Sequence, residues 1–150
     1  MRVIGVRRRP GSEPNVEAIV PPAELHAALA QADFVALTCP LTQETEGLID
    51  AAALAAMKPS AYLINVARGR VVDEPALIAA LEGRRIAGAG LDVYEDEPHV
   101  PAALIGRDDV VLLPHIASGT RETRKAMADL TLENIASFLA TGRLKTPIPE

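Results

Sequence analysis

Cysteine and tryptophan are the scarcest residues in this sequence, which has one cysteine, Cys39, and no tryptophan. A single cysteine excludes a framework of internal disulfide bonds and is typical of a reducing compartment, so we expect a cytoplasmic protein. The sequence also lacks an apolar run long enough to cross a bilayer, which argues against a membrane-spanning chain.

The sequence also has no excess of basic residues, because the formal net charge is -5 at pH 7. An acidic chain is poorly suited to nucleic acid or an anionic membrane surface, and we expect neither as the main partner. Apolar residues make up 49% of the 150 positions, so the chain can bury the core of one globular domain.

Short apolar segments alternate with segments of helical periodicity along most of the chain. The expected strands are residues 3–6, 17–20, 33–38, 61–66, 86–93 and 110–113. The expected helices are residues 22–32, 51–58, 74–81 and 121–140, with Asp50 and Asp73 as caps of the second and third. Because the strands are apolar on both faces, the alternation predicts an α/β fold: a Rossmann-like parallel sheet with helices on both faces.

Ligands of such sheets bind beyond the carboxyl ends of the strands, so the polar residues there are the candidate site. They are Arg7–Arg9, Cys39–Pro40, Arg68, Asp92–Glu97 and His115. Three of them form a chemically complementary set. Arg68 can grip a carboxylate, His115 can give or take a proton near neutral pH, and Glu97 can orient the imidazole. This set suits a small 2-oxo acid.

Each candidate residue also has a simpler interpretation. Arg68 and Glu97 fit a solvated loop and ordinary surface charge, and His115 fits the cap of the following helix. Asp92 fits an ordinary acceptor at a strand end. The spacing of these residues leaves both interpretations open.

Four ordered blocks resemble one protein family, the D-isomer-specific 2-hydroxyacid dehydrogenases. They are CPLTQETEGLID, NVARGRVVDEPALIAAL, AGAGLDVYEDEP and VVLLPHIASGT, and the resemblance runs from about Met1 to Pro147. Within the family, glyoxylate/hydroxypyruvate reductases and phosphoglycerate dehydrogenases are the most similar.

The resemblance implies a role for each candidate residue. Arg68 would bind the substrate carboxylate and carbonyl, and His115, paired with Glu97, would protonate the carbonyl oxygen as hydride arrives from a nicotinamide. Asp92 would hold the nicotinamide carboxamide, and Ala67 would line the nicotinamide side. Cys39 and Pro40 would line the adenosine side. No metal is implied.

A basic run, RRRP, follows the first expected strand, where a dinucleotide fold meets the adenosine ribose. Arg7, Arg8 and Arg9 stand there, with no acidic residue before Glu13. An acidic residue would accept the 2′-hydroxyl of NAD, whereas guanidinium groups can neutralise a 2′-phosphate. We therefore expect NADP over NAD, with a solvated basic turn as the alternative.

The sequence lacks the family's GxGxxG turn, the strand before it and the substrate-binding domain. We therefore expect residues 1–150 to form a truncated dinucleotide-binding domain that starts at its second strand and ends with the helix 121–140. Without the first strand, residues 2–6 and 33–38 would each lose a neighbour. The chain would then be weakly active or inactive alone, and would form a homodimer or pair with an N-terminal piece.

The sequence thus predicts an NAD(P)-dependent oxidoreductase of 2-hydroxy and 2-oxo acids, with glyoxylate or hydroxypyruvate as substrate. A non-catalytic remnant that binds a nucleotide or a partner is the main alternative, which the missing glycine turn favours. Formate or phosphite dehydrogenase chemistry fits less well, because formate enzymes would be expected to have glutamine in place of Glu97.

Overall fold

The computed structural model describes residues 1–148. The chain divides into two compact units, Met1–His115 and Ile116–Glu150, and each is considered by itself. Residues 149 and 150, which the expected domain includes, lie outside the described part.

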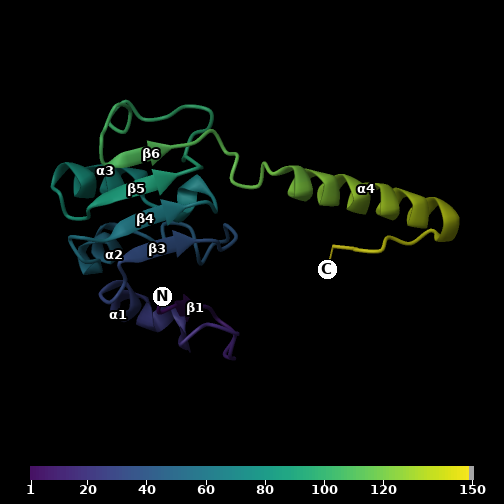
Figure 1. Cartoon of the computed structure of the whole chain (residues 1–150), viewed down its shortest axis with the longest axis horizontal. Helices are drawn as coiled ribbons and strands as arrows, with labels where there is room; N and C mark the ends of the chain where they lie inside the picture. The colour runs from purple at the N-terminus through teal and green to yellow at the C-terminus, as the bar shows by residue number, and fades with distance from the viewer. Residues whose placement is uncertain (149–150) are drawn as a thin grey trace. The chain divides into compact units, whose positions relative to one another are not determined.

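Six short strands in the first unit form two parallel sheets (Figure 1). Strands β1 (Ile4–Val6) and β2 (Ala18–Val20) pair with each other. The larger sheet has the order β3-β4-β5-β6, formed by β3 (Phe34–Leu37), β4 (Tyr62–Asn65), β5 (Gly88–Leu91) and β6 (Val110–Leu112). All of its neighbours are parallel, which confirms the predicted α/β class.

The two sheets are separate because β1 pairs only with β2, and β3 pairs only with β4. Each of these two strands therefore has one edge without a strand neighbour in the described residues. Residues 2–6 and 33–38, for which the sequence analysis expects a missing neighbour, include these two strands. Backbone groups along such edges must find partners in water or in another segment.

Short helices connect the strands of the first unit. The 3-10 turn η1 (Pro22–Glu24) leads into α1 (Leu25–Leu29), and α2 (Ala51–Ala56) and α3 (Glu74–Glu82) follow β3 and β4. Asp50 and Asp73 cap α2 and α3, as predicted, by accepting hydrogen bonds from backbone N–H groups three residues later. Each cap satisfies a donor that the first helical turn leaves unpaired.

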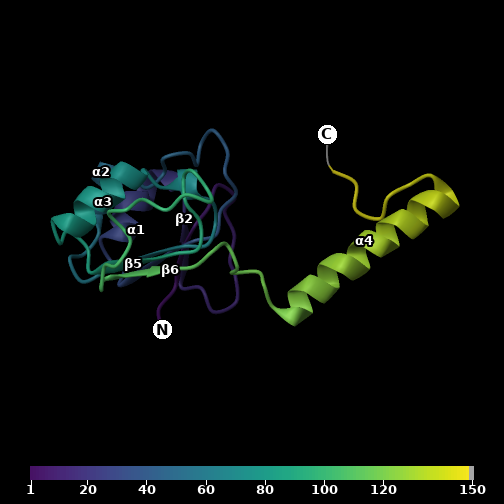
Figure 2. The same ribbon diagram turned by 90° about the horizontal axis from the view of Figure 1, so that it is seen from above.

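The core lies between the larger sheet and its helices, which pack on one side of the strands (Figure 2). Leu37, Leu63, Leu91 and, from α2 and α3, Leu54 and Leu77 are buried there. Side chains at the alternate strand positions point to the other face and are more exposed, among them Phe34, Tyr62 and Val111. Flanking helices therefore cover the first face, while the second carries apolar side chains open to solvent.

Replacement of Asp73 by alanine is expected to lower the free energy of unfolding by about 1 kcal/mol, the usual cost of a lost helix cap. The carboxylate Oδ1 lies 2.9 Å from the backbone nitrogen of Ala76, and alanine cannot replace this acceptor. Urea unfolding followed by circular dichroism measures the change. Asp73→Asn is the matched control, because asparagine caps about equally well. Equal losses in both variants would contradict the capping role.

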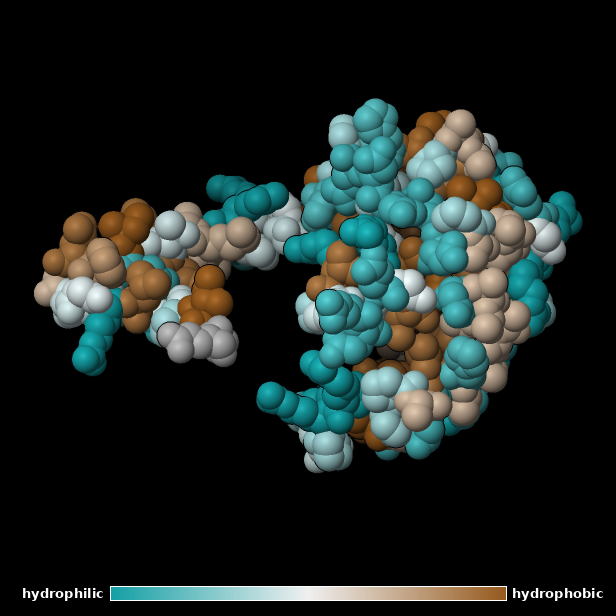
Figure 3. Space-filling view, turned by 180° about the vertical axis from the view of Figure 1, so that it is seen from behind, coloured by the Kyte–Doolittle hydropathy of each residue, from teal (hydrophilic) through white to brown (hydrophobic). Residues whose placement is uncertain are grey.

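The second unit is dominated by one long helix, α4 (Arg121–Thr141), close to the predicted 121–140. Thr120 caps its start, and Gly142, with φ 72°, ends it in a left-handed conformation that suits glycine. Exposed apolar side chains occur along this helix (Figure 3). They are Met127, Leu130, Leu132, Ile135, Phe138 and Leu139. Across residues 1–148, no helix combines the length and the apolar character that a membrane span requires.

Candidate active site

The four strands of the larger sheet end together at one edge. Their last shared row contains Leu37, Asn65, Leu91 and Leu112. The candidate residues Cys39, Arg68, Asp92 and His115 come one to three positions after this row. Because the strands are parallel, all of these candidates lie at the carboxyl edge, as the sequence predicts.

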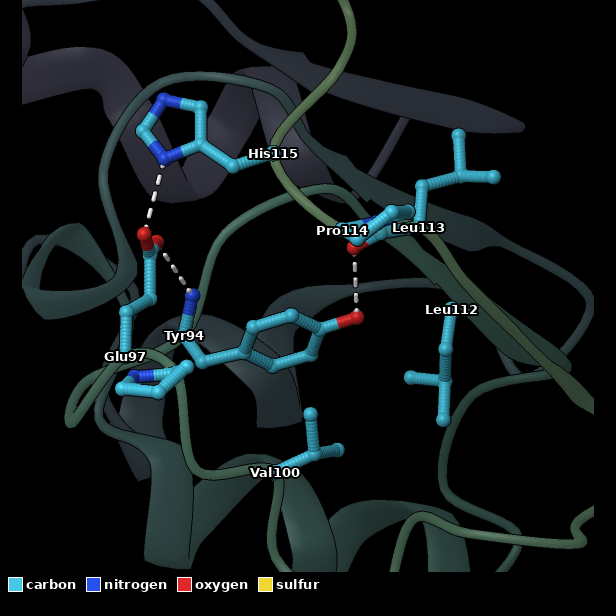
Figure 4. Close-up of a pocket in the computed structure, with 8 residues that line it drawn as sticks. Tyr94, Glu97, Val100, Leu112, Leu113, Pro114 and His115 are labelled. Atoms are coloured by element: carbon cyan, nitrogen blue, oxygen red, sulfur yellow. Dashed lines mark hydrogen bonds and ion pairs between the residues drawn. The ribbon is translucent and has the colours of Figure 1, made fainter.

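Glu97 and His115 form a direct pair at this edge (Figure 4). His115 Nδ1 lies 2.8 Å from Glu97 Oε2, and Glu97 Oε1 accepts a hydrogen bond of 3.1 Å from the Tyr94 backbone N–H. The hydrogen bond from His115 is the main cause that lowers the pKa of Glu97, with smaller contributions from the Tyr94 N–H and the charges of His115 and Arg68. An ionised carboxylate can only accept, so Nδ1 carries the proton and Nε2 is left for other partners.

The pair makes the stability of the fold dependent on pH. Because the pKa of Glu97 is lowered on folding, its contribution is present above the ordinary value of 4.5 and is lost as the pH falls through the folded-state value. Below pH 4.5, the free energy of unfolding of the parent chain should therefore fall more steeply than that of Glu97→Gln. Urea titrations across this pH range measure how the free energy of unfolding of each protein depends on pH. Equal pH dependence in the two proteins would contradict the contribution of the Glu97–His115 pair.

Arg68 lies at the end of β4, and its charge contributes to the lowered pKa of Glu97. The guanidinium is exposed, with Nη1 donating a 2.6 Å hydrogen bond to the Ala67 carbonyl. The remaining N–H groups of a guanidinium can still bind an anion bidentately. The structure thus brings Arg68 to the same edge as the Glu97–His115 pair.

Asn65 shapes the loop that carries Arg68, and the sequence interpretation missed it. Its side chain, only 1% exposed, accepts from the Ala67 N–H and donates to the Arg68 carbonyl, both at 3.0 Å. A polar residue at the end of an otherwise apolar strand, AYLINV, was the available signal. A buried amide must find hydrogen-bond partners, and here it finds them in the following turn.

Gly69 lies where the Arg68 loop meets the loop that carries Glu97. A Cβ atom at Gly69 would lie 1.9 Å from the Tyr94 carbonyl oxygen and 2.5 Å from the Glu95 nitrogen. The absence of a side chain therefore lets the Arg68 loop touch the loop that carries Glu97.

A pocket of about 310 Å³ lies beside the pair, and its lining includes Tyr94, Val100, Leu112 and Leu113 together with Glu97 and His115 (Figure 4). The walls are largely apolar, and Glu97 and His115 lie at one end.

The residues expected around the cofactor lie at the ends of β3, β4 and β5. Ala67 and Asp92 are buried, and Cys39 is half-buried, with a thiol pKa that burial raises. Pro40 is exposed, and its carbonyl accepts a 2.6 Å hydrogen bond from the Thr45 hydroxyl.

The arginine run follows β1, at the end of the smaller sheet. Arg7 pairs with Glu13 at 2.7 Å and Arg8 pairs with Glu44 at 3.2 Å, and both pairs are exposed. Arg9 is exposed, and its carbonyl accepts from Arg7 Nε. Exposed ion pairs are weak, so these guanidinium groups can exchange their present partners for another anion.

Comparison with known proteins identifies the family. Residues 1–117 match the family model described as D-isomer specific 2-hydroxyacid dehydrogenase, NAD binding domain. A glyoxylate reductase from Pyrococcus furiosus is 46% identical over 138 residues, which are 92% of this chain and 41% of that protein. The chain belongs to the D-isomer specific 2-hydroxyacid dehydrogenases. This family consists of oxidoreductases.

Solved structures of two other oxidoreductases share the fold. An NADPH-dependent glyoxylate/hydroxypyruvate reductase from Sinorhizobium meliloti, in complex with NADP and malonate, superposes with a TM-score of 0.88 at 39% identity. The match covers 98% of this chain and 45% of that enzyme. A D-mandelate dehydrogenase from Rhodotorula graminis gives a TM-score of 0.90 at 35% identity. The chain thus spans less than half the length of these dehydrogenases.

Metal ligands do not gather in the described part of the chain: no group of three or more histidine, cysteine, aspartate or glutamate side chains could hold an ion there.

Proposed function

We propose that this chain is the cofactor-binding part of an NAD(P)-dependent reductase of small 2-oxo acids such as glyoxylate or hydroxypyruvate. The observation that carries the proposal is the Glu97–His115 pair at 2.8 Å, with Arg68 near enough to affect the pKa of Glu97. The names of the glyoxylate reductases from Pyrococcus furiosus and Sinorhizobium meliloti support the substrate class.

The proposed reaction assigns a separate task to each group. Arg68 binds the carboxylate of the oxo acid with its exposed N–H groups. His115, protonated with Glu97 as its counter-ion, donates the proton on Nε2 to the carbonyl oxygen. A reduced nicotinamide, when bound, would supply the hydride that the carbonyl carbon accepts. The imidazole is then neutral, keeps its proton on Nδ1 toward Glu97, and takes up another proton from solvent.

We also propose that the carboxyl edge holds the nicotinamide end of the cofactor. Asp92, which follows β5 directly, would hold its carboxamide, and Ala67 would line the nicotinamide side. We further propose that Arg7, Arg8 and Arg9 bind the 2′-phosphate of NADP, and that Cys39 and Pro40 line the adenosine side. Arg7 and Arg8 would exchange their exposed partners, Glu13 and Glu44, for the phosphate.

The chain alone should bind the cofactor weakly and turn over slowly, because its 150 residues contain no GxGxxG turn to hold the pyrophosphate. A complete site would then require more protein, from a second copy or from an amino-terminal piece. The unpaired edges of β1 and β3 are the positions at which an added strand would be expected to pair.

Titration with NADPH and NADH tests the proposal on two proteins. One is this chain, and the other is a hybrid in which the amino-terminal part of the Sinorhizobium meliloti reductase precedes it. We expect tighter binding of NADPH than of NADH, and reduction of glyoxylate or hydroxypyruvate by the hybrid. A hybrid that folds and binds NADPH but leaves every 2-oxo acid unreduced would contradict the reductase and favour a non-catalytic remnant that binds a nucleotide. One that folds but binds neither nucleotide would favour a remnant that binds a partner.

A further inference from the structure

Tyr94 connects the two strand ends that carry the acid–base pair. Its side chain is only 7% exposed, and its hydroxyl oxygen lies 2.9 Å from the Leu113 carbonyl (Figure 4). The Leu91 carbonyl lies 3.2 Å from the same oxygen. The hydroxyl has one proton, and the shorter distance favours Leu113 as its acceptor. The backbone N–H of the same residue donates to Glu97. One residue thus contacts the carboxylate and the segment that leads into His115.

The backbone of the segment from Leu113 to His115 is anchored at its first residue. The Leu113 N–H donates to the Leu91 carbonyl at 2.9 Å, but Pro114 has no N–H to donate. His115 adopts φ 54°, a left-handed conformation that residues with a side chain rarely take. Such a conformation persists only where its surroundings hold it. The Leu113 carbonyl is therefore a point at which a hydrogen bond can fix the direction of the imidazole.

We infer that the Tyr94 hydroxyl is a positioning group for His115. By holding the Leu113 carbonyl, it keeps the backbone of the next two residues in place and directs Nδ1 toward Glu97. This arrangement keeps the proton on Nδ1 and leaves Nε2 for the substrate. The catalytic consequence rests on the proposed function, whereas the geometric consequence can be measured in this chain without substrate.

Tyr94→Phe removes one oxygen atom and keeps the ring that fills the pocket wall. The chain has one other tyrosine, Tyr62, whose exposed ring stacks on Phe34 with centroids 5.6 Å apart. Tyr62→Phe is therefore the matched control, because it makes the same chemical change at a distance from the strand ends. Neither variant alters the charge of the chain near neutral pH.

Nitrogen-15 NMR of the imidazole rings gives the readout. The chain has three histidines, and His26 and His99, both exposed, serve as internal references. In the parent chain, neutral His115 should show the tautomer with the proton on Nδ1. In Tyr94→Phe, its two ring nitrogens should shift toward the tautomer mixture that His99 shows, while Tyr62→Phe should keep the parent pattern. The Glu97→Gln variant provides the spectrum of a ring without its carboxylate.

In the hybrid reductase, the same variant should lower kcat by about 10-fold with little change in KM, because a misdirected acid affects the reaction more than binding. A His115 spectrum in Tyr94→Phe identical to that of the parent would overturn the inference, as would loss of folding or an equal shift in Tyr62→Phe. The NMR result is independent of turnover. An inactive hybrid with the expected His115 shift would therefore contradict the proposed function and leave the positioning role supported.

Discussion

His115→Asn should lower the rate of oxo-acid reduction by about 10²–10⁴-fold, the contribution that general acid catalysis makes in enzymes. An amide has no proton to transfer near neutral pH, so the carbonyl oxygen would lose its donor. Asparagine is the appropriate replacement, because it tolerates the left-handed backbone that His115 adopts at φ 54°. The measurement is the oxidation of NADPH by the hybrid reductase at saturating hydroxypyruvate.

His99→Asn is the matched control for this replacement. His99 is exposed in the same loop as Glu97, and its Nδ1 lies 3.6 Å from Asp96. It should therefore keep the parent rate. If His115→Asn also kept the parent rate while still binding NADPH, the proton would have to come from another group, and the assignment of the acid would be wrong.

The sequence predicts the order of the elements well, because this order follows from local patterns. Caps at Asp50 and Asp73, apolar strands and the long periodic helix from Arg121 are visible in the spacing of neighbouring residues. The first expected helix, 22–32, is less regular than predicted. It begins as the 3-10 turn η1, and α1 then ends at Leu29, so its length was overestimated. Helix ends depend on tertiary packing as well as on propensity.

The position of the candidate residues at one edge could also be predicted, because parallel strands bring their carboxyl ends together independently of the loop conformations. Contacts between loops could not be predicted in the same way. Nothing near Gly69 in the sequence indicates that Tyr94, 25 residues later, would lie against it. Likewise, the hydroxyl of Tyr94 reaches the Leu113 carbonyl across 19 residues. Such contacts depend on how separate loops pack against each other. The local periodicity of the sequence carries no information about this packing.

Gly69→Ala should be among the most destabilising single substitutions in the first unit. The added methyl group would lie 1.9 Å from the Tyr94 carbonyl oxygen and 2.0 Å from its carbon, inside van der Waals contact with both. These are backbone atoms next to a buried side chain, so they cannot rotate away as a flexible side chain would. We expect the free energy of unfolding to fall by about 3 kcal/mol, the upper part of the range for overpacked interiors.

The relief of this clash would also affect the site, because the backbone that must move includes the Tyr94 N–H that donates to Glu97. Gly69→Ala should therefore shift the His115 ring signals as well as the midpoint of urea unfolding. Gly5→Ala is the matched control, since its Cβ would meet Ile19 at an ordinary 3.5 Å, and its effect should stay within about 1 kcal/mol. Equal midpoints of urea unfolding for the two variants would show that the Arg68 and Glu97 loops can separate with little loss of stability. The direct contact between these loops would then not be what fixes the geometry of the site.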